Sequence, residues 1–68
     1  MTDPLAPPVP ARSAILSLLL GAHPPTLTVR EIVGAMRLFG IAESTTRVAL
    51  TRMVAGGDLI RDDTGHTL

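Results

Sequence analysis

The sequence predicts a mainly α-helical domain of the winged helix-turn-helix class, with three helices and a small β-hairpin. Three segments carry helical signals, and each is followed by glycine or proline. The last ten residues contain two short strand-like runs around the turn residues 62–65. The third helix, predicted over residues 43–55, carries two arginines among small hydroxylic side chains, which is typical of a helix that reads DNA.

Size and composition restrict the classes of protein to consider. The chain has 68 residues, enough for one small domain with a marginally stable core. It lacks cysteine, which excludes disulfides and thiolate metal sites and fits a reducing cytoplasm. Phe39 is the only aromatic residue, which excludes the stacking platforms of single-strand binders. The formal net charge is zero, but residues 30–52 hold four arginines against two acids, and residues 58–68 hold three aspartates against one arginine.

Residues 1–10 contain four prolines and are expected to form a flexible tail, which leaves residues 11–68 as the folded domain. Pro10 suits the first turn of a helix predicted over residues 11–20. Gly21 suits its C-terminal cap. The apolar run 14–22 is shorter than the ~20 residues that span a bilayer, so we expect a buried helix and no membrane segment. The buried face is predicted to contain Ile15, Leu18 and Leu19, widened by Leu16 and Leu20.

A capping box predicts the start of the second helix. Thr28 and Glu31 have the Thr-x-x-Glu spacing, in which each side chain caps the backbone N–H of the other residue. The helix is predicted over residues 29–39, after a short extended segment at 26–28. Gly40 supplies the positive φ that ends it. Its apolar face is predicted to be Val29, Ile32, Val33 and Met36.

The third helix divides into an inward and an outward face. Gly56-Gly57 ends it, and residues 59–61 and 66–68 are predicted to pair as a hairpin. Ile41 is expected to pack inward at the turn between the second and third helices. The inward face is predicted to be Thr46, Ala49, Leu50 and Met53, and the outward face Ser44, Arg47, Val48 and Thr51, flanked by Thr45 and Arg52.

The order of elements and several residues resemble the N-terminal DNA-binding domain of the PaaX-like repressors. The similarity covers residues 11–68 and includes a moderately specific pattern, Gly-Ile…Arg-x-Ala-Leu-x-Arg-Met-Val-x-x-Gly. The resemblance implies a bacterial repressor of phenylacetate degradation. It also implies that dimerisation, and binding of an acyl-CoA inducer such as phenylacetyl-CoA, belong to further regions to which nothing in these 68 residues corresponds. The matching residues are Arg12-Ser13-Ala14-Ile15-Leu16, Gly40-Ile41, Arg47, Ala49-Leu50-Thr51-Arg52-Met53-Val54-Ala55, Gly57 and Leu59.

Three features depart from the pattern of that family. Ala42 stands where the family usually has serine, so Glu43 or Ser44 is expected to cap the third helix with a shifted start. Asp58 stands where the family commonly has tryptophan. The wing carries Asp62 and Asp63 where the family's wing is usually rich in arginine, which leaves open whether this wing contacts DNA.

The candidate DNA-binding residues lie on the third helix. We expect Arg47 and Arg52 to contact DNA, and the alternative is that they are solvated arginines in i, i+4 pairs such as Glu43–Arg47. Arg12 is expected to be a solubilising residue, and the alternative is a contact with the DNA backbone. Arg61 is expected to pair with neighbouring aspartates, and the alternative is a contact between the wing and DNA. The full candidate set is Ser44, Thr45, Arg47, Val48, Thr51 and Arg52.

The sequence does not predict catalysis. His23 and His66 lack the spacing of metal ligands and are expected at the surface. Asp62 and Asp63 are adjacent in a turn, where side chains diverge, so they do not form a catalytic carboxylate pair. The chain contains no nucleophile elbow and no glycine-rich phosphate loop. We therefore predict no enzyme, no cofactor and no metal.

Together, these features predict a sequence-specific DNA-binding domain of a bacterial transcriptional repressor. Its partner would be double-stranded DNA, bound as a homodimer in the full-length protein, with the third helix in the major groove and the second across the backbone. The rival interpretation is a winged-helix module for protein interaction, which zero net charge and an acidic wing also suit. The salt dependence of DNA binding separates the two, because phosphate contacts release counterions.

Overall fold

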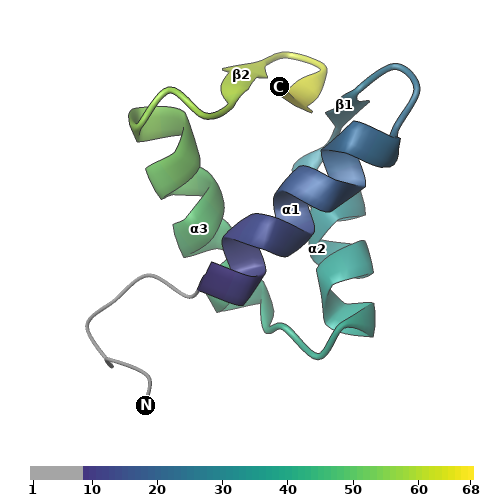
Figure 1. Ribbon diagram of the computed structural model, residues 1–68, viewed down its shortest axis with the longest axis vertical. Helices are drawn as coiled ribbons and strands as arrows, with labels where there is room; N and C mark the ends of the chain where they lie inside the picture. Colours follow the sequence, from purple (N-terminus) through teal and green to yellow (C-terminus); the bar gives the residue numbers. More distant parts are fainter. Residues whose placement is uncertain (1–8) are drawn as a thin grey trace.

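The computed structural model describes residues 9–68 and confirms the winged helix-turn-helix (Figure 1). Of the tail predicted over residues 1–10, residues 1–8 lie outside the described part. Figure 1 shows α1 lying across the helical layer, with the strands gathered at one end. The elements in chain order are α1 (Val9–Gly21), β1 (Thr26–Leu27), α2 (Val29–Leu38), α3 (Glu43–Ala55), β2 (Ile60–Asp62) and β3 (Gly65–Thr67).

Helix α1 is longer than predicted and is buried on one side. It begins at Val9, two residues before the predicted start, and ends at Gly21. The prediction that Leu20 widens the buried face is wrong, because its side chain is 70% exposed. Successive residues turn by about 100° around a helix, and α2 and α3 cover the side that carries Leu19, so Leu20 points away from both. The buried residues are Ala11, Ile15 and Leu19, with Ala14, Leu16 and Leu18 packed against them.

The capping box at the start of α2 is confirmed. The Thr28 hydroxyl accepts from the Glu31 backbone N–H at 3.1 Å, and the Glu31 carboxylate accepts from the Thr28 backbone N–H at 2.9 Å. The helix ends at Leu38, one residue before the predicted end, and Phe39 is its C-cap. Gly40 has the expected positive φ of 78° and turns the chain toward α3.

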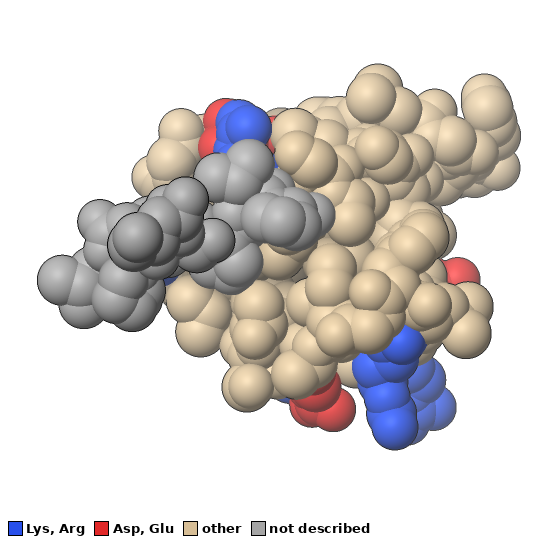
Figure 2. Space-filling model, turned by 60° about the horizontal axis from the view of Figure 1, so that its bottom comes forward, with Lys and Arg blue, Asp and Glu red and all other residues tan. Residues whose placement is uncertain are grey.

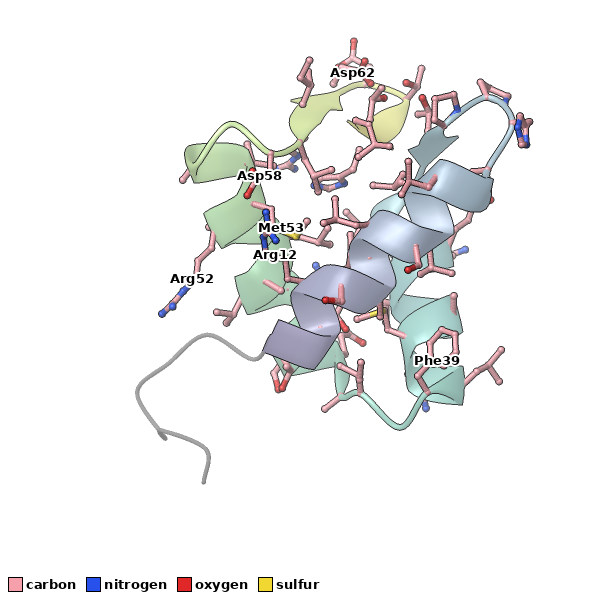
Figure 3. The ribbon with its side chains drawn as sticks, in the orientation of Figure 1. Arg12, Phe39, Arg52, Met53, Asp58 and Asp62 are labelled. Atoms are coloured by element: carbon pink, nitrogen blue, oxygen red, sulfur yellow. The ribbon has the colours of Figure 1, made fainter. Side chains whose placement is uncertain are left out.

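Helix α3 has the predicted bounds and the predicted inward face. Thr46, Ala49, Leu50 and Met53 are all buried, and Figure 3 shows Met53 pointing from α3 toward α1. The Thr46 hydroxyl donates to the Ala42 carbonyl oxygen at 3.1 Å, which satisfies this buried polar group within the helix.

The start of α3 has no side-chain cap. Ala42 occupies the N-cap position, and the expectation that Glu43 or Ser44 would take over with a shifted start is wrong. Glu43 does not cap the helix because its carboxylate accepts a hydrogen bond from Arg47, one turn further along. Backbone N–H groups in the first turn of α3 therefore lack the side-chain acceptor that an N-cap serine would supply.

We predict that Ala42→Ser raises the free energy of unfolding by about 0.5–2 kcal/mol. Ala42 already has the extended N-cap conformation, with φ −68° and ψ 153°, so a serine hydroxyl can accept from the first turn without a change of backbone. Urea denaturation measures the effect. The matched control is Ala55→Ser at the exposed last residue of α3, where no N–H needs capping. Equal results for the two variants would contradict the prediction.

The three strands form one antiparallel sheet in the order β1-β3-β2. The predicted hairpin is confirmed, but its first strand lies one residue later and its second one residue earlier than predicted. Leu59 stays outside β2 because its backbone N–H donates to the Met53 carbonyl oxygen at the end of α3. On β1, the Thr26 hydroxyl lies 2.8 Å from the Thr67 hydroxyl. The sheet therefore ties the connection before α2 to the chain end after α3.

One core lies between the three helices and the sheet. Ile41 is half-buried against it, as predicted. Within residues 9–68, no helix is long and apolar enough to cross a membrane. The buried apolar residues are Ala11, Ile15, Leu19, Ile32, Val33, Met36, Ala49, Leu50, Met53 and Leu59.

Candidate nucleic-acid interface

The outward face of α3 is exposed along its length. Five of the six candidate residues are exposed, and Thr45 is half-buried. Figure 3 shows the Arg52 side chain extending from α3 away from the other helices. The structure therefore presents the candidate residues on one helix, with Thr45 the least accessible. The exposed five are Ser44, Arg47, Val48, Thr51 and Arg52.

Arg47 is held in place by its own helix. Its Nε–H donates to the Glu43 carboxylate at 2.7 Å, which is the i, i+4 pair that the sequence left open as an alternative. Both side chains are more than half exposed, at 59% and 52%, so the pair adds little stability. A guanidinium has five N–H donors, and only Nε is used here. Arg47 can therefore keep this pair and still donate to a second acceptor.

A groove between α2 and the first half of α3 carries three of the arginines. Its volume is about 490 Å³, and Glu43 is the only acid among its lining residues. Gly34 lies on its α2 side, where an added β-carbon would meet open space. The local excess of positive charge seen in residues 30–52 is thus gathered in one groove, lined by Val29, Arg30, Val33, Gly34, Arg37, Glu43 and Arg47.

A second hollow lies on the other side of Arg47, between α3 and the wing. It measures about 190 Å³ and includes Arg61. The prediction that Arg61 pairs with neighbouring aspartates is wrong, since no ion pair of Arg61 occurs among residues 9–68. Neighbouring residues of a strand point to opposite faces, so Asp62 does not follow Arg61 toward α3. This hollow, here called the wing pocket, is lined by Val29, Arg47, Leu50, Thr51, Val54, Arg61 and His66.

His66 is buried, which contradicts the prediction that it is a surface residue. Its side chain is 3% exposed because β3 is the central strand and His66 lies between Leu27 of β1 and Arg61 of β2. Its Nδ1 is buried with no hydrogen-bond partner in the described residues. Burial, followed by the charge of Arg61, lowers the pKa of His66 from its ordinary value and so favours the neutral ring. His23 is exposed, as predicted.

At the acidic tip of the wing, Asp62 stabilises the turn between β2 and β3. The Asp62 carboxylate accepts from the Thr64 hydroxyl at 2.6 Å, from the Thr64 N–H at 2.8 Å and from the Gly65 N–H at 3.2 Å. The hydrogen bonds from Thr64 hold the pKa of Asp62 below its ordinary value. Figure 3 shows Asp62 at the outer edge of the molecule. Its role is therefore structural, as an Asx-type turn.

Arg12 forms an ion pair that the sequence did not indicate. Its guanidinium lies 3.4 Å from the Asp58 carboxylate, and Figure 3 shows the two side chains facing each other. Both are substantially exposed, so the pair contributes little to stability. Asp58 occupies the position at which the resemblance led us to expect tryptophan. In the described part of the chain, no group of three metal-ligating side chains comes together.

The end of the molecule that carries the connection from α2 to α3 has a different character. Figure 2 shows a surface made mainly of uncharged side chains, with arginines and acids at its edges. Leu38 and Phe39, at the end of α2, are 88% and 65% exposed. Exposed apolar side chains are common on proteins and do not by themselves define a site. The arginine-lined surface on both sides of Arg47 is therefore the better candidate for nucleic acid.

A protein-family model described as PaaX-like protein matches residues 10–68, which cover almost the whole described domain. The comparison with curated proteins gave no match, and neither did the comparison with solved structures. The family match includes the helix-turn-helix and the wing together.

Proposed function

Since this chain belongs to the PaaX-like family, we propose that it is the sequence-specific DNA-binding domain of a transcriptional repressor of phenylacetate-type catabolism. It acts by binding and not by catalysis, in the cytoplasm, as a homodimer in the full-length regulator. The observation that carries the proposal is the exposed face of α3 with an arginine-lined hollow on each side of Arg47.

The proposed complex places α3 in the major groove. Arg47 lies in the first half of the helix on the outward face, where reading helices present side chains to base edges. Arg52 lies five residues later, about 140° away around the axis, and therefore contacts a backbone phosphate. Arg30 and Arg37 of α2 line the adjacent groove and contact the backbone on that side. The short side chains Ser44 and Thr51 allow close approach of the helix.

We predict different effects for the two arginines of α3. Arg47→Ala should weaken binding to the preferred duplex by about 1–3 kcal/mol and relax the preference at one base pair. Arg52→Ala should weaken all duplexes alike and make the salt slope shallower by about one unit. Fluorescence anisotropy with single-substituted duplexes at several salt concentrations measures both effects. A dimerised form of the domain raises the affinity into the measurable range.

Arg12→Ala is the matched control, because it removes one positive charge at the Asp58 ion pair and not on the face of α3. If Arg47→Ala and Arg52→Ala both bind like the parent, α3 does not read DNA. The mainly uncharged surface in Figure 2, together with the exposed Leu38 and Phe39 at the end of α2, then favours the alternative of a protein-interaction module. Such a module would bind its partner with little dependence on salt, because it releases no counterions from DNA.

A further inference from the structure

The wing pocket is lined by two arginines and by no acid, and the acid that pairs with Arg47, Glu43, lies outside it. Arg47 and Arg61 line it from α3 and β2, and none of its lining residues is an aspartate or glutamate. Its volume of about 190 Å³ is several times the ~30 Å³ share of one water in the liquid, so a small polyatomic ion fits. Two cations facing one hollow repel each other, and an anion between them removes that repulsion.

The donors that an anion would meet can be named. Thr51 lines the pocket, but its hydroxyl donates to the Arg47 carbonyl oxygen at 3.0 Å and is not available as a donor. Arg61 makes no ion pair in residues 9–68, and Arg47 uses only its Nε toward Glu43. The two guanidinium groups are therefore the binding groups, and their forked N–H geometry suits the oxygens of phosphate.

His66 supplies a second, independent observation. It lines the same pocket, and its Nδ1 is buried without a hydrogen-bond partner in the described residues. Buried polar atoms without a partner are rare in folded proteins and often mark the place of an ion or a water. An anion beside this ring would favour the protonated, positively charged form of the imidazole, because the two opposite charges attract.

We propose that the wing pocket binds one phosphate-type oxyanion between the guanidinium groups of Arg47 and Arg61. Resting on the proposed function, this oxyanion is a phosphodiester of the DNA backbone, held between α3 and the wing. One terminal nitrogen of Arg47 then donates to the phosphate and the other to the base edge, while Nε keeps its pair with Glu43. The negative charge of the wing then lies at its tip, in Asp62 and Asp63, while the side that faces α3 is positive. The other source of the same chemistry is a free inorganic anion.

The first arm of the test uses sulfate, whose charge is constant near neutral pH. NMR spectra of the labelled domain are recorded during titration with sodium sulfate and, at equal ionic strength, with sodium chloride. We expect saturable shifts around the wing pocket with sulfate alone. Arg61→Gln should weaken sulfate binding at least about tenfold, as loss of a charge-assisted hydrogen bond does. Arg12→Gln, which removes the same charge outside the pocket, should leave sulfate binding unchanged.

His66 provides a readout that a merely structural change would not give. Arg61 of β2 and Arg47 of α3 line the pocket with its ring, and Asp62, on the opposite face of β2, acts on the ring through its charge alone. Bound sulfate should raise the pKa of His66, measured from the ring C–H resonances, and in Arg61→Gln the same sulfate concentration should raise it much less. No saturable response to sulfate and no change in the His66 titration would overturn the proposal.

The second arm identifies the source of the anion. A neutral methylphosphonate replaces one phosphate at a time in the preferred duplex. At one position, the methylphosphonate should weaken binding of the duplex to the parent domain as much as Arg61→Gln does. The same replacement should not weaken binding of the duplex to the Arg61→Gln variant any further. If sulfate binding is saturable but no methylphosphonate position has this effect, the wing pocket binds a free anion. That result overturns the assignment of the oxyanion to a phosphodiester. If sulfate binds and no duplex does, the pocket stands and the proposed function fails.

Discussion

Leu50→Ala is expected to lower the free energy of unfolding by about 2–5 kcal/mol. Leu50 is 3% exposed and belongs to the core that joins α3 to α1 and α2. Truncation removes apolar contacts and leaves a cavity that so small a domain cannot close by collapse. A chain of 68 residues has a total stability of roughly 3–10 kcal/mol, so this variant is expected to lose a large part of it.

Thr51→Ala is the matched control for this prediction, because it changes the next residue of the same helix. Thr51 is exposed, and its hydroxyl bonds only to the carbonyl oxygen one turn earlier, so the change should stay within about ±0.5 kcal/mol. Urea or thermal denaturation followed by circular dichroism measures both. A larger loss for Thr51→Ala than for Leu50→Ala would contradict the assignment of the two faces of α3.

Helix positions and faces could be predicted because they follow from local signals. The capping box at Thr28 and Glu31 and the positive φ of Gly40 need only neighbouring residues, and both are confirmed. The spacing of apolar residues in α3 is enough to assign Leu50 to the buried face and Thr51 to the exposed face. The sequence alone therefore places the surface that carries the candidate residues on α3, although their contacts with DNA stay a prediction.

The environment of the wing could not be predicted in the same way. Whether His66 is buried depends on which strand is central, and the pairing of β3 with β1 joins residues 41 positions apart. The sequence indicated a two-stranded hairpin, in which His66 would have one open side. Strand alternation offered one signal that was missed: Arg61 and Asp62 must point to opposite faces, which separates Arg61 from the nearest aspartate.

Gly65→Ala is expected to destabilise the domain by about 2–6 kcal/mol, mainly by opening the sheet. A β-carbon on Gly65 would lie 2.3 Å from the Leu27 carbonyl oxygen and 2.7 Å from its carbonyl carbon. Both atoms belong to backbone, so no side-chain rotation relieves the clash. The φ of Gly65 is +135°, a conformation that side chains rarely adopt. The strand β3 must therefore move away from β1 or change its turn.

Gly34→Ala is the matched control, since it makes the same substitution where the β-carbon meets open space within a helix. It should raise the free energy of unfolding by up to about 1 kcal/mol, because alanine favours helix. Urea denaturation gives both values, and the chemical shifts of Leu27 and His66, which are partners across β1 and β3, report the opening of that pair. If Gly65→Ala has the same free energy of unfolding as the parent, the pairing of β1 with β3 does not contribute to stability. If the variant opens as expected while the helices persist, His66 loses its burial, its pKa returns toward the ordinary value, and sulfate binding at Arg61 is lost with the pocket.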